Sequence, residues 1–284
     1  MNPTAVYTVV FSPTGTSRKI AAAVAQGVAR HGGSCNATAN TAAGADAGTN
    51  AAAGSAAKAF TTIDLTHAAG KPPVLPADAA AVFAVPVYGG RVAPAALERL
   101  QEIRGEGTPA VVLAVYGNRD YEDALIELRD LAVSRGFVPL AAGAFIGEHS
   151  YSRPGMPVAE GRPDRSDLAA AESFGRQAAE KLASVSSPAD LPAVTVPGNI
   201  PYKEVKPSTP TAPVTLKENC TACGLCIELC PTAAIRFDDE GEIVTDPLLC
   251  TKCCACVKEC PNQARIFDTP YTAMLHTNFS ARRE

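Results

Sequence analysis

Apolar residues gather in short continuous runs over the first 183 positions. Segments with apolar residues at helical spacing lie between some of these runs. The runs lie at residues 5–11, 79–85, 111–115 and 137–146. Such runs predict strands of a parallel sheet, because a strand covered on both faces does not alternate with polar residues. Ile20, Val24 and Val28 recur at helical spacing after the first run, and residues 167–183 predict a last helix. Strands that alternate with helices predict an α/β fold with a doubly wound parallel sheet.

Two stretches of unusual composition divide the rest of the chain. Residues 35–59 hold twelve alanines among Gly, Thr and Asn without a periodic apolar face, which predicts a mobile insertion in the first domain. Seven prolines fall within residues 188–213, which predicts an extended linker. We therefore expect an α/β domain at 1–187, a linker at 188–213 and a small α+β domain at 214–284.

Charge and hydropathy exclude two classes of partner. The formal net charge of −4 and the pI of about 5.7 argue against a nucleic-acid partner. No run of 18 or more apolar residues occurs, so we expect no membrane span. The N-terminal residues lack the basic start of a signal peptide, and we expect a cytoplasmic protein.

Cysteine spacing carries the strongest chemical signal. A C-x2-C-x2-C-x3-C-P run occurs twice, at Cys220, Cys223, Cys226 and Cys230-Pro231, and at Cys250, Cys253, Cys256 and Cys260-Pro261. This doubled run is a signature of two [4Fe–4S] clusters, in which each iron takes one thiolate. The first three cysteines of a run can reach one cluster, whereas the x3 step and the proline turn the fourth toward the other cluster. The predicted ligand sets are Cys220, Cys223, Cys226 and Cys260 for one cluster, and Cys250, Cys253, Cys256 and Cys230 for the other.

Other uses of these cysteines fit less well. Zinc sites use pairs of C-x2-C and lack the triplet spacing. Disulfides need an oxidising compartment, and no segment directs the chain to one. Cys254 is out of phase with the ligands and is expected to be a buried spare thiol, while Cys35 stands alone. Residues 215–268 resemble the bacterial two-cluster ferredoxins, and this resemblance implies a duplicated module with short strands after each cluster loop.

A hydroxyl-rich loop, S-P-T-G-T-S at residues 12–17, follows the first predicted strand and precedes a helix. Backbone N–H groups at a helix N-terminus and the helix dipole favour an anion there. The loop lacks both the lysine of a nucleoside-triphosphate loop and the G-x-G-x-x-G pattern of dinucleotide sites. A monophosphate held by neutral donors fits the loop, although helix capping alone would also use such residues.

Two further strand ends carry small, polar and aromatic residues. They read P-V-Y-G-G-R at 86–91 and Y-G-N-R-D-Y-E-D at 116–123. Ligands of open α/β sheets bind beyond the carboxyl ends of the strands. In order and position these three loops resemble the phosphate loop and the two ring loops of flavodoxins. With its cysteine runs, the whole chain resembles the flavodoxin–ferredoxin fusion proteins called EFR-type ferredoxins.

The resemblance to flavodoxins implies FMN as a cofactor and assigns residues to it. The phosphate would be held by Ser12, Thr14, Gly15, Thr16 and Ser17. The ring would be lined on one edge by Pro86, Val87, Tyr88, Gly89 and Gly90, and on the other by Tyr116, Gly117, Asn118, Tyr121 and Asp123. Tyr88 or Tyr121 would stack on the ring, or would simply pack in the core. Gly89 and Gly90 would let the backbone approach the ring, or would form an ordinary turn.

These expectations predict an electron-transfer iron–sulfur flavoprotein that passes low-potential electrons between two [4Fe–4S] clusters and FMN, with redox proteins as partners. The alternative is an FMN-dependent reductase of a small substrate. The loop at 148–153 suggests this function, because its residues His149, Tyr151 and Arg153 could bind an anionic substrate. The same side chains could instead bind the ferredoxin domain or serve only the loop's structure. A redox-responsive regulator would need a DNA-binding helix or a basic patch, and the sequence contains neither.

Overall fold

A computed structural model describes residues 1–31, 60–67, 70–205 and 209–283. The predicted insertion at 35–59 and Cys35 lie outside these described residues. Within them, no helix combines the length and the apolar character that crossing a membrane requires.

The first domain is built on a parallel sheet with the strand order β2-β1-β4-β7-β8. Its strands are β1 (Val6–Val10), β2 (Thr61–Asp64), β4 (Ala80–Tyr88), β7 (Thr108–Tyr116) and β8 (Phe137–Ile146). In chain order this is 2-1-3-4-5, the doubly wound order of flavodoxin-like folds, so the predicted fold class is confirmed. The sequence did not predict β2, because this short, half-exposed edge strand has no apolar run. Shorter strands pair beside the sheet: β5 (Arg91–Val92) with β4, and β3 (Val74–Leu75) with β6 (Arg104–Gly105).

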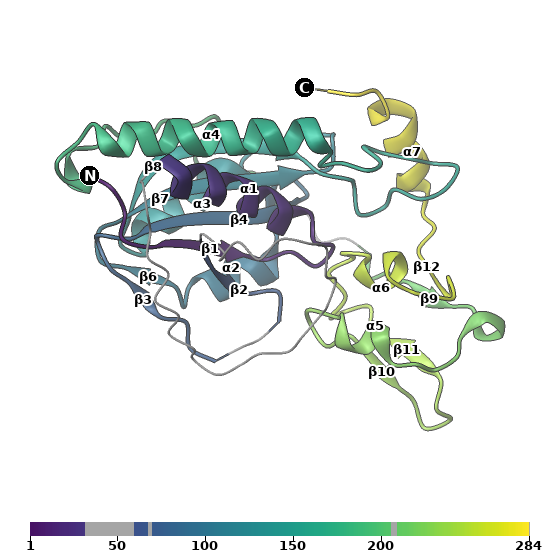
Figure 1. The fold of residues 1–284 in the computed structure, drawn as a ribbon. Helices are drawn as coiled ribbons and strands as arrows, with labels where there is room; N and C mark the ends of the chain where they lie inside the picture. Colours follow the sequence, from purple (N-terminus) through teal and green to yellow (C-terminus); the bar gives the residue numbers. More distant parts are fainter. Residues whose placement is uncertain (32–59, 68–69, 206–208, 284) are drawn as a thin grey trace.

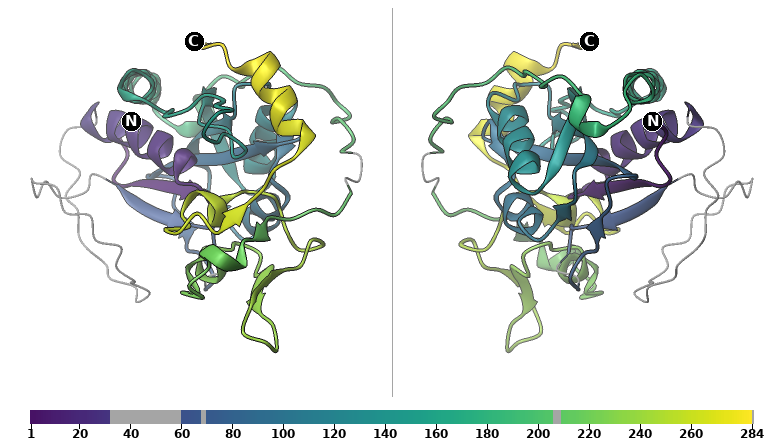
Figure 2. Two further views of the ribbon diagram at one scale, coloured as in Figure 1. Left: turned by 90° about the vertical axis from the view of Figure 1, so that its right-hand side faces the viewer. Right: turned by 90° about the vertical axis from the view of Figure 1, so that its left-hand side faces the viewer.

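Two helices cover each face of the sheet (Figure 1). Helices α1 (Thr16–His31) and α4 (Arg165–Ala183) lie on one face, and α2 (Pro94–Leu100) and α3 (Ala124–Ser134) lie on the other, as the end views in Figure 2 show. Ile20, Val24 and Val28 of α1 are fully buried, as their helical spacing predicts. The two apolar layers leave only the strand ends free to carry polar groups.

Helices α1 and α4 approach so closely that two glycines are required at their contact. A Cβ on Gly27 would lie 2.1 Å from the carbonyl oxygen of Glu172, and a Cβ on Gly175 would lie 2.1 Å from that of Val24. Real Cβ atoms do not come this close to backbone oxygens, so any side chain would push the helices apart.

We expect Gly175→Val to destabilise the first domain. Overpacking a tight contact costs roughly 1–3 kcal/mol, and in a domain of this size each kcal/mol lowers Tm by about 2–4 °C. Thermal melting followed by circular dichroism measures this change. Gly70→Val is the matched control, because a Cβ at this exposed glycine meets no atom within 4 Å. Equal melting temperatures for the two variants would contradict the packing argument.

The C-terminal module contains two short helices and two small sheets. The helices are α5 (Leu225–Glu228) and α6 (Ala255–Lys258), and a 3-10 turn occurs at Lys217–Asn219, while another, at Pro188–Asp190, lies in the linker before the module. Strand β10 (Ile235–Phe237) pairs with β11 (Ile243–Thr245), as the ferredoxin resemblance implies. Strand β12 (Arg265–Ile266) pairs with β9 (Val214–Thr215), so the end of the module returns to its beginning. Figure 1 shows the module beyond the carboxyl ends of the main strands.

Two outer segments bind the module to the first domain. Within the proline-rich linker, the backbone N–H groups of Asn199 and Lys203 donate to the Asp123 carboxylate, at 2.8 and 2.7 Å. The Tyr202 hydroxyl donates to the Asp130 carboxylate at 2.6 Å. After the module, helix α7 (Pro270–Phe279) turns back along the first domain (Figure 1). Its His276 contacts the carbonyl oxygen of Pro157 at 2.9 Å. The linker, the module and helix α7 therefore each contact the first domain.

Candidate functional site

The loop at residues 12–17 connects β1 to α1 at the carboxyl edge of the sheet. Ser12 closes it, because its hydroxyl accepts a hydrogen bond from the Arg18 backbone N–H at 3.0 Å while its own N–H donates to Thr66 at 2.9 Å. Gly15 turns the loop with a φ of 79°. The Arg18 guanidinium pairs with Asp64 on β2 and does not line the cavity beside this loop. The loop thus presents neutral donors, as its composition predicts.

Ser17 shows that the loop can hold an anion. This residue is fully buried, and its hydroxyl has no hydrogen-bond partner among the described residues. It lines a cavity together with Thr14 and Thr16. A buried hydroxyl without a partner costs free energy, and a phosphate oxygen would supply the missing acceptor. The residues present therefore fit a phosphate group.

Four strand ends meet around this cavity. Its lining comprises Ser12, Pro13, Thr14, Thr16, Ser17, Pro86, Val87, Tyr88, Val115, Tyr116, Gly117, Gly147, Glu148, His149, Ser150 and Cys253. The phosphate loop lies at one end, and Tyr88 and Tyr116 supply aromatic surface. The structure therefore brings together nine of the residues that the sequence assigned to FMN, and the donor set suits a phosphorylated aromatic ligand.

The other six assigned residues lie outside the lining of this cavity. They are Gly15, Gly89, Gly90, Asn118, Tyr121 and Asp123. The buried Asn118 side chain donates to the carbonyl oxygens of Phe279 and Ala281, at 2.7 and 2.8 Å, and so holds the C-terminal tail. Tyr121 packs its ring against Tyr116 at 5.4 Å. Burial acts to raise the pKa of Asp123, but the hydrogen bonds from Lys203 and Asn199 outweigh it, and the pKa falls below its usual value.

His149 is a member of the cavity that the sequence did not assign to the flavin. Its ring lies against Gly117, where a Cβ would come within 2.4 Å of the ring. Its Nδ1 accepts the Tyr151 backbone N–H at 3.0 Å, so the neutral ring carries its proton on Nε2. Burial, followed by the charges of Lys258 and Arg119, lowers the pKa of His149 to about 4. His149 therefore lines the cavity as a neutral ring at pH 7. In the sequence, only the composition of the 148–153 loop indicated a role for His149.

The lowered pKa of His149 predicts a pH-dependent stability. The unfolded chain binds a proton near the usual histidine pKa of 6.5, whereas the folded chain binds it only near pH 4. Between these values the unfolded state holds more protons, so the free energy of unfolding falls as the pH falls from 6.5 to about 4.

We expect His149→Gln to flatten this part of the pH profile. Urea unfolding followed by circular dichroism, at several pH values from about 4 to about 7, measures the slope. The exposed His67 gives the matched control His67→Gln. Equal slopes for the unchanged protein and His149→Gln would show that His149 does not cause the dependence.

The eight cysteines of the two runs surround two cavities. The first cysteine cavity, that of the first run, is lined by Cys220, Cys223, Cys226 and Cys260. The second cysteine cavity is lined by Cys230, Cys250 and Cys253, and Cys256 lines both. All nine described cysteines are free thiols. No three His, Cys, Asp or Glu side chains among the described residues converge on the position of a single metal ion. The sulfurs are instead distributed around cavities, which fits clusters whose irons each take one thiolate.

The last cysteines of the two runs accept equivalent hydrogen bonds. The Ala234 backbone N–H donates to Cys230 Sγ at 3.2 Å, and the Ala264 N–H donates to Cys260 Sγ at the same distance. Each of these cysteines ends one run but lines the cavity of the other run. Hydrogen bonds to sulfur favour the thiolate form, as ligation requires.

Cys254 is buried, as the sequence predicts for a spare thiol. It begins α6 with a φ of 57°, whereas Gly224 occupies the matching position before α5 with a φ of 79°. This left-handed conformation favours glycine, so a side chain at position 254 is strained. Its Sγ contacts the Lys252 carbonyl oxygen at 3.6 Å.

The loop at 148–153 binds the C-terminal module. Lys258 donates to Glu148 at 2.5 Å, and Arg153 donates to Asp268 at 2.8 Å. The Tyr151 ring packs edge-on against Phe267, with centroids 5.2 Å apart. Of the roles that the sequence left open for this loop, the structure shows contact with the ferredoxin-like module.

One cysteine of the second run lines cavities of both kinds. Cys253 lines the cavity of the phosphate loop and also the cavity that holds Cys230 and Cys250. Burial, followed by the nearby Cys253 and Cys254 thiols, raises the pKa of Tyr88 well above its usual value. Arg99 of α2 donates to the Pro231 carbonyl oxygen and holds the same end of the module. The second cysteine cavity therefore lies directly beside the cavity of the phosphate loop.

Comparisons with known proteins find similarity for parts of the chain. Residues 219–264 match the family described as 4Fe-4S dicluster domain. No curated protein matches the chain. Among solved structures, the Flv1 flavodiiron core from Synechocystis sp. PCC6803 is 15% identical over 63% of this chain and 35% of that chain, with a TM-score of 0.37. This chain thus spans about a third of that structure.

Two further structures cover most of their own length. Flavodoxin from Megasphaera elsdenii is 12% identical over 62% of this chain and 98% of its own, with a TM-score of 0.33. NAD(P)H:quinone oxidoreductase from Methanothermobacter marburgensis is 14% identical over 64% and 98%, with a TM-score of 0.33. At these scores the assignment of the first domain rests on its strand order. That order shows a flavodoxin-like fold in the first domain, residues 219–264 are similar to 4Fe-4S dicluster domains, and the two together fit a flavodoxin–ferredoxin fusion.

Proposed function

We propose that this chain is an electron-transfer protein that carries FMN and two [4Fe–4S] clusters and passes low-potential electrons between them. The observation that carries this proposal is the position of Cys253, which lines both the second cysteine cavity and the cavity of the phosphate loop. A cluster bound at Cys253 would therefore neighbour a flavin held by the first domain. Such proximity favours internal transfer, because the two sites never have to meet by diffusion.

The residues of the chain would bind, orient and shield these groups. Ser17, Thr14 and Thr16 would hold the phosphate, while Tyr88 and Tyr116 would flank the ring. The flavin, when bound, can exchange one or two electrons, and the clusters exchange single electrons. His149 would keep a neutral N–H at the cavity wall. Redox proteins are the proposed partners, and the cytoplasm the proposed location.

A reductase acting on a small substrate is the alternative function. The 148–153 loop suggested it, but Arg153 and Tyr151 bind Asp268 and Phe267 of the module. These contacts occupy two of the three side chains that an anionic substrate would need. The observed docking therefore favours electron transfer over substrate reduction.

Anaerobic purification followed by iron, sulfide and flavin assays tests the proposed cofactors. We expect both clusters and FMN in each chain. Photoreduction of the clusters should then be followed by flavin reduction at a rate that does not change with protein concentration. A rate that rises in proportion to concentration would mean that the domains do not form an internal path.

The buried hydroxyl of Ser17 allows a sharp test of the phosphate site. A hydrogen bond to a charged group contributes roughly 1.5–3 kcal/mol, so Ser17→Ala should weaken FMN binding about tenfold to hundredfold. Riboflavin lacks the phosphate and should bind weakly to both proteins, with the same affinity. Fluorescence quenching of the two flavins measures these affinities. If Ser17→Ala weakens riboflavin and FMN equally, the loop does not hold the phosphate.

A further inference from the structure

Arg265 is a buried arginine at the start of β12. Only 2% of its surface is exposed. Its guanidinium donates to the hydroxyls of Thr215 and Thr245, both at 2.5 Å, and to the Pro213 carbonyl oxygen at 3.1 Å. Among the described residues, no carboxylate lies within ion-pair distance of it, and its Nε has no acceptor. A full positive charge is therefore buried among neutral oxygens.

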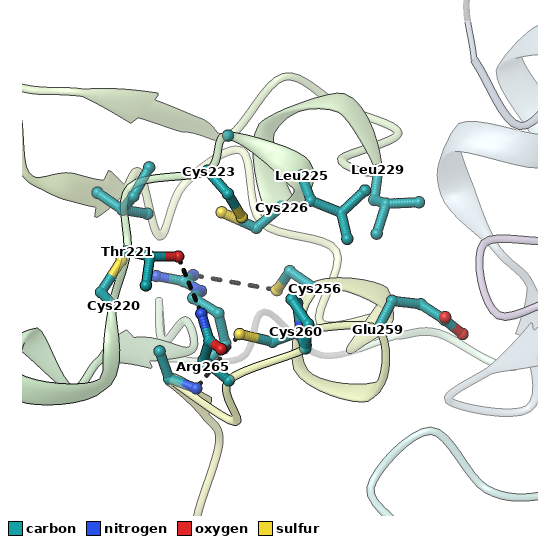
Figure 3. A pocket seen from close by; sticks show the side chains of 15 residues that line it. Cys220, Thr221, Cys223, Leu225, Cys226, Leu229, Cys256, Glu259, Cys260 and Arg265 are labelled. Carbon is teal, nitrogen blue, oxygen red and sulfur yellow. Dashed lines mark hydrogen bonds between the residues drawn. The ribbon is translucent and has the colours of Figure 1, made fainter.

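A buried charge is costly unless an opposite charge offsets it. The groups near Arg265 that can become negative are cysteine sulfurs. Its guanidinium lies 4.0 Å from Cys256 Sγ. It also lines the cavity of the first run, and Figure 3 shows it among Cys220, Cys226, Cys256 and Cys260. The geometry places the cation between ligands from both runs.

The two halves of the duplicated module carry different residues at the position of Arg265. The two alanines that donate to Cys230 and Cys260 are equivalent, and each is followed by a buried residue. In the first half that residue is Ile235, which lines the second cavity, and in the second half it is Arg265, which lines the first. An apolar residue therefore satisfies the packing of this position. The second half therefore carries a buried charge where the first half carries an apolar side chain.

The field of Arg265 reaches thiols of both runs. Its guanidinium lies 4.0 Å from Cys256 of the second run, and Arg265 lines the same cavity as Cys220 and Cys226 of the first run. In a low-dielectric interior such an interaction is much stronger than between surface charges.

We propose that Arg265 is a buried counter-ion shared by the two [4Fe–4S] clusters, and that it raises the reduction potential of both. This inference rests on the proposed function, since it requires both clusters. Reduction adds one electron to a cluster and makes it more negative, with no bond formed or broken. A fixed cation beside the ligands stabilises that added charge, and its hydrogen-bonded position prevents it from turning away. Arg265 thereby offsets the acidic residues 238–242 on the surface of the module.

Two variants of Arg265 separate charge from packing. Arg265→Gln removes the charge, and Arg265→Lys retains it, while both lose the forked hydrogen bonds. Arg236→Gln is the matched control, because Arg236 is exposed on β10 of the same module. Potentiometric titration followed by electron paramagnetic resonance reports each cluster. Iron and sulfide assays report cluster content. We expect both potentials to shift to more negative values in Arg265→Gln, to shift less in Arg265→Lys and to stay unchanged in Arg236→Gln.

Loss of the clusters would also be informative. If Arg265→Gln fails to retain them while Arg265→Lys does, the charge itself is needed, as we infer. Equal potentials, or equal cluster loss, in the lysine and glutamine variants would overturn the inference. A failure of the proposed function is distinct from both results, because the unchanged protein would then lack iron and sulfide for two clusters.

Discussion

Reversing the charge of Lys258 should slow flavin reduction by about tenfold or more, because facing like charges at an interface cost several kcal/mol. Lys258 pairs with Glu148 across the contact between the two domains, and both side chains are about three-quarters buried, at 21% and 26% exposure. Lys258→Glu would place two carboxylates together and populate undocked states. In those states a cluster at Cys253 no longer neighbours the flavin cavity.

The reciprocal change provides the rescue. Glu148→Lys combined with Lys258→Glu restores an ion pair of opposite direction and should recover most of the rate. Flavin absorbance after flash photoreduction measures the rate, with FMN content checked in each variant because Glu148 lines the cavity. Lys217→Glu is the matched control, since its pair with Glu242 is exposed and lies within the module. If Lys258→Glu reduces the flavin at the unchanged rate, this docked arrangement is not the route of transfer.

Replacing Cys260 should remove a cluster held mostly by the other run. Cys260 lines the cavity of Cys220, Cys223 and Cys226, so Cys260→Ala leaves that cluster with three thiolates. We expect iron content to fall by about half, with the spectrum of the second cluster retained. Cys254→Ala is the matched control and should keep the full iron content.

The two cavities also predict different consequences for the flavin. The second cavity contains Cys253 and neighbours the flavin cavity, so flavin photoreduction should survive in Cys260→Ala. Cys230→Ala removes a ligand from that second cavity and should abolish flavin photoreduction. Loss of the 250–256 cluster in Cys260→Ala would contradict the crossed ligation.

The sequence by itself determined the fold class and supplied a hypothesis for the chemistry of the sites. Continuous apolar runs predicted β1, β4, β7 and β8, because strands buried on both faces are readable without any partner. The cysteine spacing predicted two [4Fe–4S] clusters with crossed ligand sets, and the four cysteines of each predicted set line one of two cavities. The three polar loops could be assigned to one sheet edge, because the carboxyl ends of parallel strands lie together.

Only the tertiary structure decided which of these residues meet. Asn118 and Asp123 belong to a loop typical of flavin contact, yet they bind the C-terminal tail and the linker. The burial of Arg265 beside cysteines of both runs, the docking of Lys258 on Glu148 and the placement of Cys253 at the flavin cavity likewise have no local signal. Each of these contacts joins residues far apart in the chain, and only the packing of one domain against the other brings them within reach.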